Sequence, residues 1–204
     1  MSEENLTEGY SILEETYMLI CEPPYQNLDT LLEDLPNFSG AGFYTQLRRI
    51  AEHPAFEPVE NEEKIFSAAG DTCDDYQNLI NAARKAVEHG YRVFILPNPK
   101  RFRTPDFIFE RKGVYKLFDL KTISGSNSVD NRLKESVGQT NRVLLHMVSN
   151  YKPRPLAKSI KRYFELNPEA IEVLVIKGKK FISIVRKDTL GESYIKYFMV
   201  KYTK

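Results

Sequence analysis

The chain has few of the residues that build disulfide frameworks and zinc sites. Only two cysteines, Cys21 and Cys73, occur among its 204 residues, and they lie far apart in sequence. Neither a disulfide framework nor a C-x-x-C zinc pair is therefore expected. The three histidines, His53, His89 and His146, have no paired ligand spacing either. This cysteine usage predicts a reducing, cytoplasmic environment.

Long hydrophobic runs and several common catalytic motifs are also absent. No apolar stretch approaches the roughly 20 residues that a membrane span needs. The acidic start of the chain, with Glu3, Glu4 and Glu8, is unlike the cationic start of a secretory signal. We therefore expect a soluble protein with no membrane partner. The chain also has no P-loop, no G-x-G-x-x-G and no G-x-S-x-G, so nothing supports nucleotide hydrolysis, dinucleotide binding or esterase activity.

Charge is distributed unevenly along the chain. Residues 1–75 contain 17 acidic and three basic residues, and residues 76–204 contain 26 basic and 11 acidic residues, so the two segments have net charges of −14 and +15. An excess of positive charge is typical of a surface that binds phosphate backbones, because neutralised phosphates release counterions. The alternative is a basic surface that is merely solvated.

Prolines and changes of periodicity divide the chain into two predicted regions. We expect an acidic, helical N-terminal segment over residues 1–65 and a basic domain over residues 66–204. Helical patterns in the first region end near prolines. They cover residues 9–21, 26–35 and 43–53.

The sequence of the second region predicts an α/β fold with the element order αβββααββ. Amphipathic spacing predicts helices, and runs of β-branched and aromatic residues between turn signals predict strands. The expected helices cover residues 72–89, 129–149 and 155–166, and the expected strands cover residues 91–96, 105–110, 114–121, 171–176 and 180–186.

The second and third of these strands form a hairpin that contains a possible metal site. A turn centred on Lys112-Gly113 places Asp106 directly opposite Asp119. Strand alternation then puts Lys121 on the same face as both carboxylates. Two carboxylates in this arrangement repel each other unless a cation lies between them, and Mg²⁺ or Mn²⁺ suits oxygen ligands of this kind. The alternative is one aspartate that caps a turn and another in a surface ion pair.

These residues resemble a known nuclease signature. Thr104-Pro105-Asp106 followed by Asp119-Leu120-Lys121 is similar to the PD-(D/E)xK motif, and the resemblance extends over roughly residues 72–186. Together with Gly90-Tyr91-Arg92-Val93, the pattern most resembles nuclease domains at the C-termini of contact-dependent inhibition toxins and of phage head-morphogenesis proteins. The resemblance implies a restriction-endonuclease-like core, with a mixed central sheet flanked by helices, after the small N-terminal helical segment.

The resemblance also implies roles for individual residues. Asp106 and Asp119 would bind Mg²⁺ or Mn²⁺ with the backbone carbonyl of Leu120, and Lys121 would position water or stabilise developing charge. The family often adds an acid from the first helix. Asp75 is our choice for that metal ligand, and Asp74 is nearly as suitable.

Further residues are expected to act on the nucleic acid. Gln139 and Arg142 form a Q-x-x-R pattern like the one on the helix that follows the motif in many members, and we expect Gln139 in the catalytic group. Asn131, Glu135, Gln139, Arg142 and His146 would form one polar stripe on that helix. The basic loop before the motif would bind the phosphate backbone together with Arg142. Its basic residues are Lys100, Arg101 and Arg103. A solvated loop and a solvated helix face are the alternatives.

The sequence thus predicts a metal-dependent endonuclease that acts on DNA or tRNA as a toxin or mobile-element nuclease. Its expected partners are nucleic acid and an immunity or inhibitor protein, and as a toxin it would be delivered into a target cell. The alternative is a non-catalytic nucleic-acid-binding module of nuclease ancestry in a phage or mobile element. A third hypothesis is that the acidic N-terminal segment is an autoinhibitory arm that imitates nucleic acid.

Overall fold

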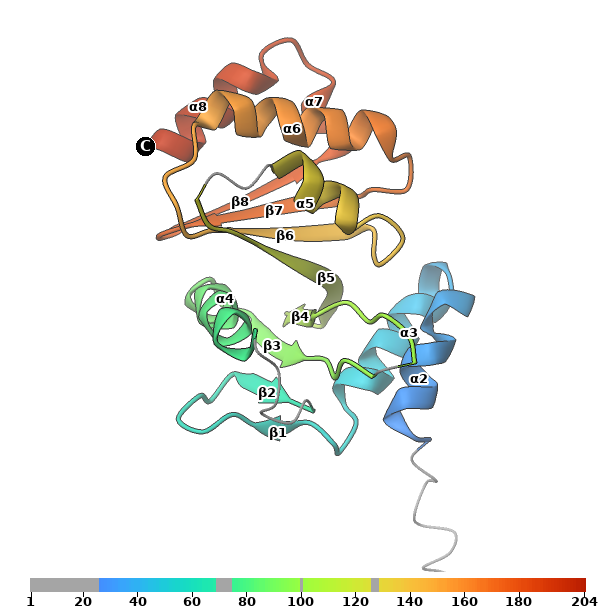
Figure 1. Ribbon diagram of the computed structural model, residues 1–204. Helices are drawn as coiled ribbons and strands as arrows, with labels where there is room; N and C mark the ends of the chain where they lie inside the picture. The colour runs from blue at the N-terminus through green and yellow to red at the C-terminus, as the bar shows by residue number, and fades with distance from the viewer. Residues whose placement is uncertain (1–25, 69–74, 100, 126–128) are drawn as a thin grey trace, which may run out of the picture.

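The protein has a mixed α/β fold built on an eight-stranded sheet (Figure 1). The computed structural model describes residues 26–68, 75–99, 101–125 and 129–204. The strands follow one another across the sheet in sequence order. Strands β2 and β3 are parallel, as are β5, β6 and β7, and every other neighbouring pair is antiparallel. The strands are β1 (Glu57–Pro58), β2 (Ile65–Ser67), β3 (Arg92–Ile95), β4 (Phe107–Arg111), β5 (Val114–Ile123), β6 (Arg142–Met147), β7 (Glu172–Lys177) and β8 (Lys180–Val185).

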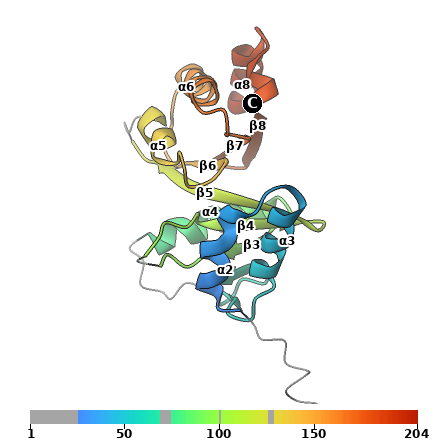
Figure 2. The same ribbon diagram turned by 90° about the vertical axis from the view of Figure 1, so that its right-hand side faces the viewer.

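Helices cover the sheet in three groups, each with its own hydrophobic core. Helix α4 (Tyr76–Glu88) packs against one face, and α2 (Leu28–Asp34) and α3 (Gly40–Ala51) pack against the other face at β3, β4 and β5. Helices α5 (Val129–Glu135), α6 (Pro153–Leu166) and α8 (Tyr194–Thr203) cover β5 to β8. The short elements η1 (Leu35–Asn37) and α7 (Arg186–Thr189) complete the described helices. Figures 1 and 2 show α2 and α3 beside one half of the sheet and α6 and α8 beside the other.

The β4–β5 hairpin forms as the sequence predicts. Phe107 pairs with Phe118, and the turn uses positive φ angles at Lys112 and Gly113, of 52° and 76°. Oε1 of Glu110 accepts a hydrogen bond from the Gly113 amide at 2.7 Å and so closes the turn. Alternation then sends Phe107 into the core under α4 and Ile108 into the core under α2 and α3. Both faces of the hairpin are therefore covered, which fixes its register.

The predicted helix over residues 129–149 is wrong. Helix α5 ends at Glu135, Gly138 has a φ of +85°, and residues 142–147 form strand β6 between β5 and β7. The apolar residues here are buried on both faces of a parallel sheet, so their run shows no alternation and matches helical spacing by coincidence. From α4 to β8 the element order is αβββαβαββ instead of αβββααββ.

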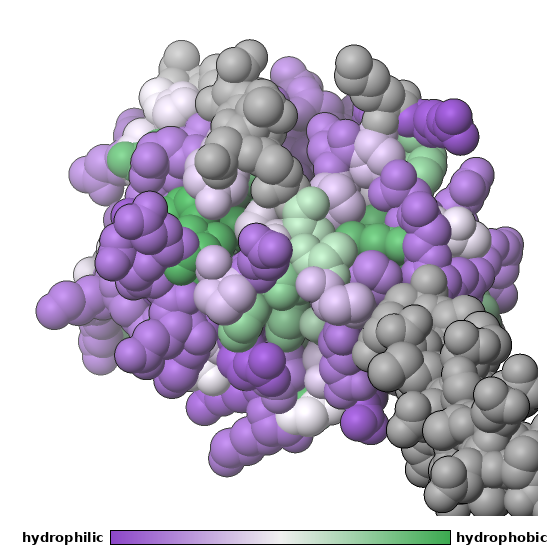
Figure 3. Space-filling view, turned by 90° about the horizontal axis from the view of Figure 1, so that it is seen from below, coloured by the Kyte–Doolittle hydropathy of each residue, from purple (hydrophilic) through white to green (hydrophobic). Residues whose placement is uncertain are grey.

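The N-terminal region shares the sheet and a core with the rest of the chain. Strand β2 pairs with β3, and Leu47 and Ile50 of α3 pack in one cluster with Ile108 and Leu117. The expected helices over residues 26–35 and 43–53 correspond to α2 and α3, and the expected helix over residues 9–21 lies outside the described residues. Seen from the β1 end, hydrophobic residues lie at the centre of the surface and hydrophilic ones surround them (Figure 3). Within the described residues, no helix is long and apolar enough to span a membrane.

Candidate active site

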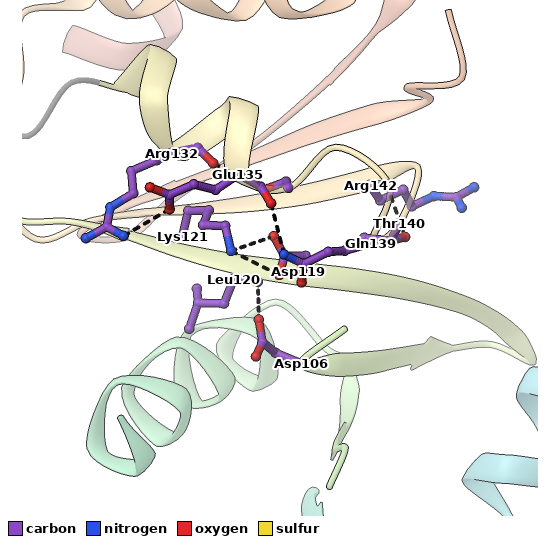
Figure 4. A network of polar contacts seen from close by, with 10 residues as sticks. Asp106, Asp119, Leu120, Lys121, Arg132, Glu135, Gln139, Thr140 and Arg142 are labelled. Atoms are coloured by element: carbon purple, nitrogen blue, oxygen red, sulfur yellow. Dashed lines mark hydrogen bonds and ion pairs between the residues drawn. The ribbon is translucent and has the colours of Figure 1, made fainter. Parts of the chain in front are cut away.

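Asp106 and Asp119 lie opposite one another at the point where the β4–β5 hairpin opens (Figure 4). Asp106 directly precedes β4. Its amide donates a hydrogen bond to the carbonyl oxygen of Phe118 at 3.0 Å. Its Oδ2 accepts one from the amide of Leu120 at 2.5 Å. Asp106 is thus bonded to the residues on both sides of Asp119, so the backbone of β5 holds the two carboxylates together.

Lys121 joins the carboxylates from the same strand, as alternation predicts. Its Nζ lies 2.9 Å from Oδ2 of Asp119 and donates a hydrogen bond to Oδ1 at 3.2 Å. Both side chains are largely buried, with exposed fractions of 14% for Lys121 and 3% for Asp119. Oδ2 of Asp119 is buried and forms an ion pair with Lys121. One buried ammonium therefore faces two carboxylates, which leaves a deficit of positive charge.

The lack of positive charge makes the carboxyl group of Asp106 harder to ionise. Burial raises the pKa of its carboxyl group from the ordinary value to about 7, and the charge of Asp119 adds to the increase. The hydrogen bond from Leu120 and the charge of Lys121 oppose the increase but do not cancel it. The two carboxylates are therefore strained when both are charged, and a cation or a proton relieves that strain.

The carboxylates open into a cavity of about 610 Å³. Helix α4, the loop before β4, the end of β5 and helix α5 contribute its walls. The predicted site residues among its lining are Asp75, Arg103, Asp106, Asp119, Leu120, Lys121 and Gln139. The structure thus brings together residues that are distant in sequence around one polar hollow.

Helix α5 and the turn after it form the wall opposite α4. Glu135 and Arg132 form an ion pair at 3.1 Å, and Nε2 of Gln139 donates a hydrogen bond to the carbonyl oxygen of Glu135 at 2.9 Å (Figure 4). Gln139 was among the site residues predicted from the sequence, whereas Arg132, which also lines the cavity, was not. Its spacing of three residues from Glu135 was the available signal.

The other predicted residues lie at the edge of the cavity or beyond it. Asp75 precedes α4, and its Oδ1 accepts a hydrogen bond from Nδ2 of Asn78 at 3.2 Å. Arg103 is exposed and lines the cavity, whereas the exposed Arg101 does not. Asp74 and Lys100 lie outside the described residues.

The predicted polar stripe on one helix does not exist. Gln139 lies in the turn after α5, and Arg142 and His146 lie in β6. Nε of Arg142 is 3.4 Å from Oε2 of the buried Glu172. His146 is buried, and this burial lowers its pKa. The prediction of one shared face fails because residues 142–147 form a strand and do not continue the helix.

The residues at the site fit a Mg²⁺ or Mn²⁺ ion bound through few protein ligands. Within the described residues no group of three or more histidine, cysteine, aspartate or glutamate side chains is arranged to hold a metal. Mg²⁺, however, commonly binds through one or two carboxylates and keeps several waters. Asp106, directly before β4, and Asp119, in β5, provide such oxygen donors.

Comparisons with known proteins give a match to one family model. Residues 103–181, less than half of the chain, match the model of the "Contact-dependent growth inhibition CdiA C-terminal domain". The matched segment contains Asp106, Asp119, Lys121 and Gln139. One similar solved structure is the "CdiA-CT/CdiI toxin and immunity complex from Burkholderia pseudomallei". It is 17% identical, covers 57% of this chain and 92% of that chain, and has a TM-score of 0.35, too low to establish a common fold. No curated protein matches the chain.

Proposed function

We propose that the chain is a metal-dependent endonuclease of the PD-(D/E)xK type that hydrolyses phosphodiester bonds in DNA or RNA, with tRNA among the candidates. One observation carries the proposal. Two carboxylates held on adjacent strands lie beside a buried lysine, at the base of a polar cavity of about 610 Å³. A stable fold gains nothing from like charges placed this way. The arrangement is useful when a cation and a phosphate enter the cavity.

Each residue has a role that its position supports. Asp106 and Asp119 would hold Mg²⁺ or Mn²⁺ together with the backbone carbonyl of Leu120. The bound ion would supply charge stabilisation for the pentavalent phosphoryl transition state. Lys121, whose Nζ is 2.9 Å from Asp119, would orient the attacking water by hydrogen bonding. Asp75 and Gln139 both line the cavity, where they would order further waters or substrate oxygens.

Positive charge would bring the nucleic acid to this cavity. Arg103 is exposed at its edge, and residues 76–204 have a net charge of +15. Lysine and arginine side chains that neutralise phosphates contribute much of the affinity of such interfaces. Arg101 and Lys100 are adjacent in sequence and would extend the same contact. Arg142, expected from the sequence to do the same, has a side chain that is 11% exposed and lies 3.4 Å from Glu172, so it would contribute little to this contact.

The family match supports a toxin role. A nuclease that inhibits growth must be held inactive in the cell that makes it, so we propose an immunity or inhibitor protein as a partner and a target cell as the place of action. The description of the matched family names growth inhibition. Binding of a protein over the cavity edge would exclude nucleic acid without any change at the carboxylates.

The test is a cleavage assay with several substrates. The full chain is incubated with plasmid DNA, a single-stranded oligonucleotide and total tRNA, each with Mg²⁺, Mn²⁺ or a chelator. We expect cleavage of at least one substrate with a metal and none with the chelator. Salt-dependent binding without cleavage under any condition would overturn the nuclease and favour the non-catalytic binding module.

A further inference from the structure

A second cavity of about 570 Å³ adjoins the first. The helices α2 and α3 and the element η1 form one wall, and the turn between α5 and β6 forms the other. The two cavities share Arg103, Thr104 and Gln139 as lining residues. The two cavities therefore border the same three residues, so neighbouring nucleotides of one strand are close enough to reach both.

Aromatic side chains distinguish the second cavity from the first. Phe38, Phe43, Tyr44 and Phe102 line it. The exposed fractions of Phe38 and Tyr44 are 39% and 48%, so neither is a core residue. The rings of Phe43 and Tyr44 meet edge to face with centroids 6.2 Å apart. Solvent-facing aromatic rings of this kind offer flat surfaces on which a planar ligand can stack.

Polar groups around these rings match a nucleotide. Arg103, which lines both cavities, supplies positive charge on the side that faces the carboxylates. Thr140 and Asn141 add hydrogen-bonding groups, and Glu33 adds an acceptor for base amino groups. Proteins that bind single strands combine a positive track for the backbone with aromatic rings for the bases. A base inside a duplex is already stacked on both sides and cannot enter such a cavity without being extruded.

We propose that the second cavity binds an unpaired nucleobase of the strand whose phosphate lies at Asp106 and Asp119. This inference rests on the proposed function, and it assigns the N-terminal helices α2 and α3 a direct part in substrate selection. The substrate class is then single-stranded nucleic acid, or a nucleotide that can leave its helix, and Tyr44 and Phe38 are the residues that stack on it.

The absence of tryptophan from the chain allows a direct test. The Tyr44→Trp variant places one tryptophan at the cavity, and the Tyr197→Trp variant places one on α8, where Tyr197 is 56% exposed and lines neither cavity. Each full-length variant is titrated, in a chelator, with a single-stranded oligonucleotide, the same sequence as a duplex, and an abasic strand with the same phosphates. We expect quenching by the single strand alone and only for Tyr44→Trp.

Affinity measurements complete the test. The Tyr44→Ala and Phe38→Ala variants should each bind the single strand roughly five-fold or more weakly, whereas Tyr44→Phe and Tyr197→Ala should bind like the parent. Equal quenching by the abasic strand, or unchanged affinity in both alanine variants, would overturn the inference. The titrations contain no metal and therefore measure binding alone. If the single strand quenches the Tyr44→Trp fluorescence but the parent cleaves no substrate in the separate cleavage assay, the base-binding inference stands and only the nuclease proposal is refuted.

Discussion

At the scale of single residues, placing Asp106 beside Asp119 costs free energy. Asp119 is buried, and Asp106 is half-buried with its Oδ2 accepting a hydrogen bond from the Leu120 amide. The positive charge of Lys121 compensates for one of the two negative charges. The other carboxylate is then buried without a counter-charge, which costs free energy. Under the proposed function, this cost is retained because the same pair would bind a cation.

The Asp106→Asn substitution should stabilise the metal-free protein in a pH-dependent way. The pKa of Asp106 in the folded protein is raised to about 7. Folding therefore favours its protonated form, and the free energy of unfolding falls as pH rises from about 4 to about 7. Asparagine cannot ionise and can still accept the Leu120 hydrogen bond. The variant should exceed the parent by roughly 2–4 kcal/mol at pH 8 and match it near pH 4.

Urea denaturation in a chelator at several pH values measures this difference. The Asp29→Asn variant is the control, because Asp29 is exposed on α2 and lines neither cavity. A stability difference for Asp106→Asn that stays constant between pH 4 and pH 8 would show that the Asp106 carboxyl group does not carry the expected strain.

At the scale of helices and strands, the elements that were predicted correctly are those that depend on residues close together in the sequence. The β4–β5 hairpin was predicted with its register, because Lys112-Gly113 marks the turn and strand alternation separates Phe118 from Asp119. The positions of Asp106 and Lys121 follow from that register alone. Helix α6 was also predicted, since its apolar residues keep a helical period along its whole length.

Features set by distant parts of the chain could not be predicted. Strand β6 was missed because a strand buried between two parallel neighbours has no alternating pattern. The second cavity was missed because its walls come from residues 32–44, 102–105 and 138–142, which only the folded sheet brings together. No motif links Tyr44 to Gln139 in the sequence.

A buried ion network ties the strands that flank the site together. Glu172 of β7 is 3% exposed. Its carboxylate lies 2.8 Å from Nζ of Lys116 and 3.4 Å from Nε of Arg142, and it accepts a hydrogen bond from Oγ of Ser183 at 2.6 Å. Four adjacent strands, β5 to β8, therefore meet at one carboxylate.

The Glu172→Ala substitution should destabilise the fold strongly, because it leaves Lys116 and Arg142 without their anion. A loss of about 3 kcal/mol is expected, which would lower the thermal midpoint by roughly 6–12 °C. The Glu169→Ala variant is the matched control, since Glu169 is exposed. Equal midpoints for the two variants in thermal scans would show that the network contributes no stability.

At the scale of the whole molecule, charge is unevenly divided. Residues 1–25 contain six glutamates and no basic residue, and residues 76–204 have a net charge of +15. A tethered negative segment competes with nucleic acid at a high effective concentration. Because β2 pairs with β3, deletion of residues 1–70 would damage the sheet, so a test of this idea must change residues 1–25 only.

Replacing these six glutamates with glutamine should tighten binding of nucleic acid by several-fold at low salt. The positions are Glu3, Glu4, Glu8, Glu14, Glu15 and Glu22. The gain should shrink at about 0.3 M salt, where screening is short-ranged. Affinity and thermal stability are measured at both salt concentrations. A variant that is less stable but binds no tighter would mean that the segment is structural support and not an electrostatic competitor.

The central claim is that Asp106 and Asp119 together make the site catalytic. The most direct measurement is the initial cleavage rate of the full chain and of its Asp106→Asn, Asp119→Asn and Asp29→Asn variants, at equal metal and substrate concentrations. The first two variants should lose at least about 100-fold in rate while they remain folded, because each would lack one anionic ligand of the proposed metal. The Asp29→Asn variant should keep the parental rate. A parental rate in either the Asp106→Asn or the Asp119→Asn variant, from preparations free of contaminating nuclease, would contradict the claim.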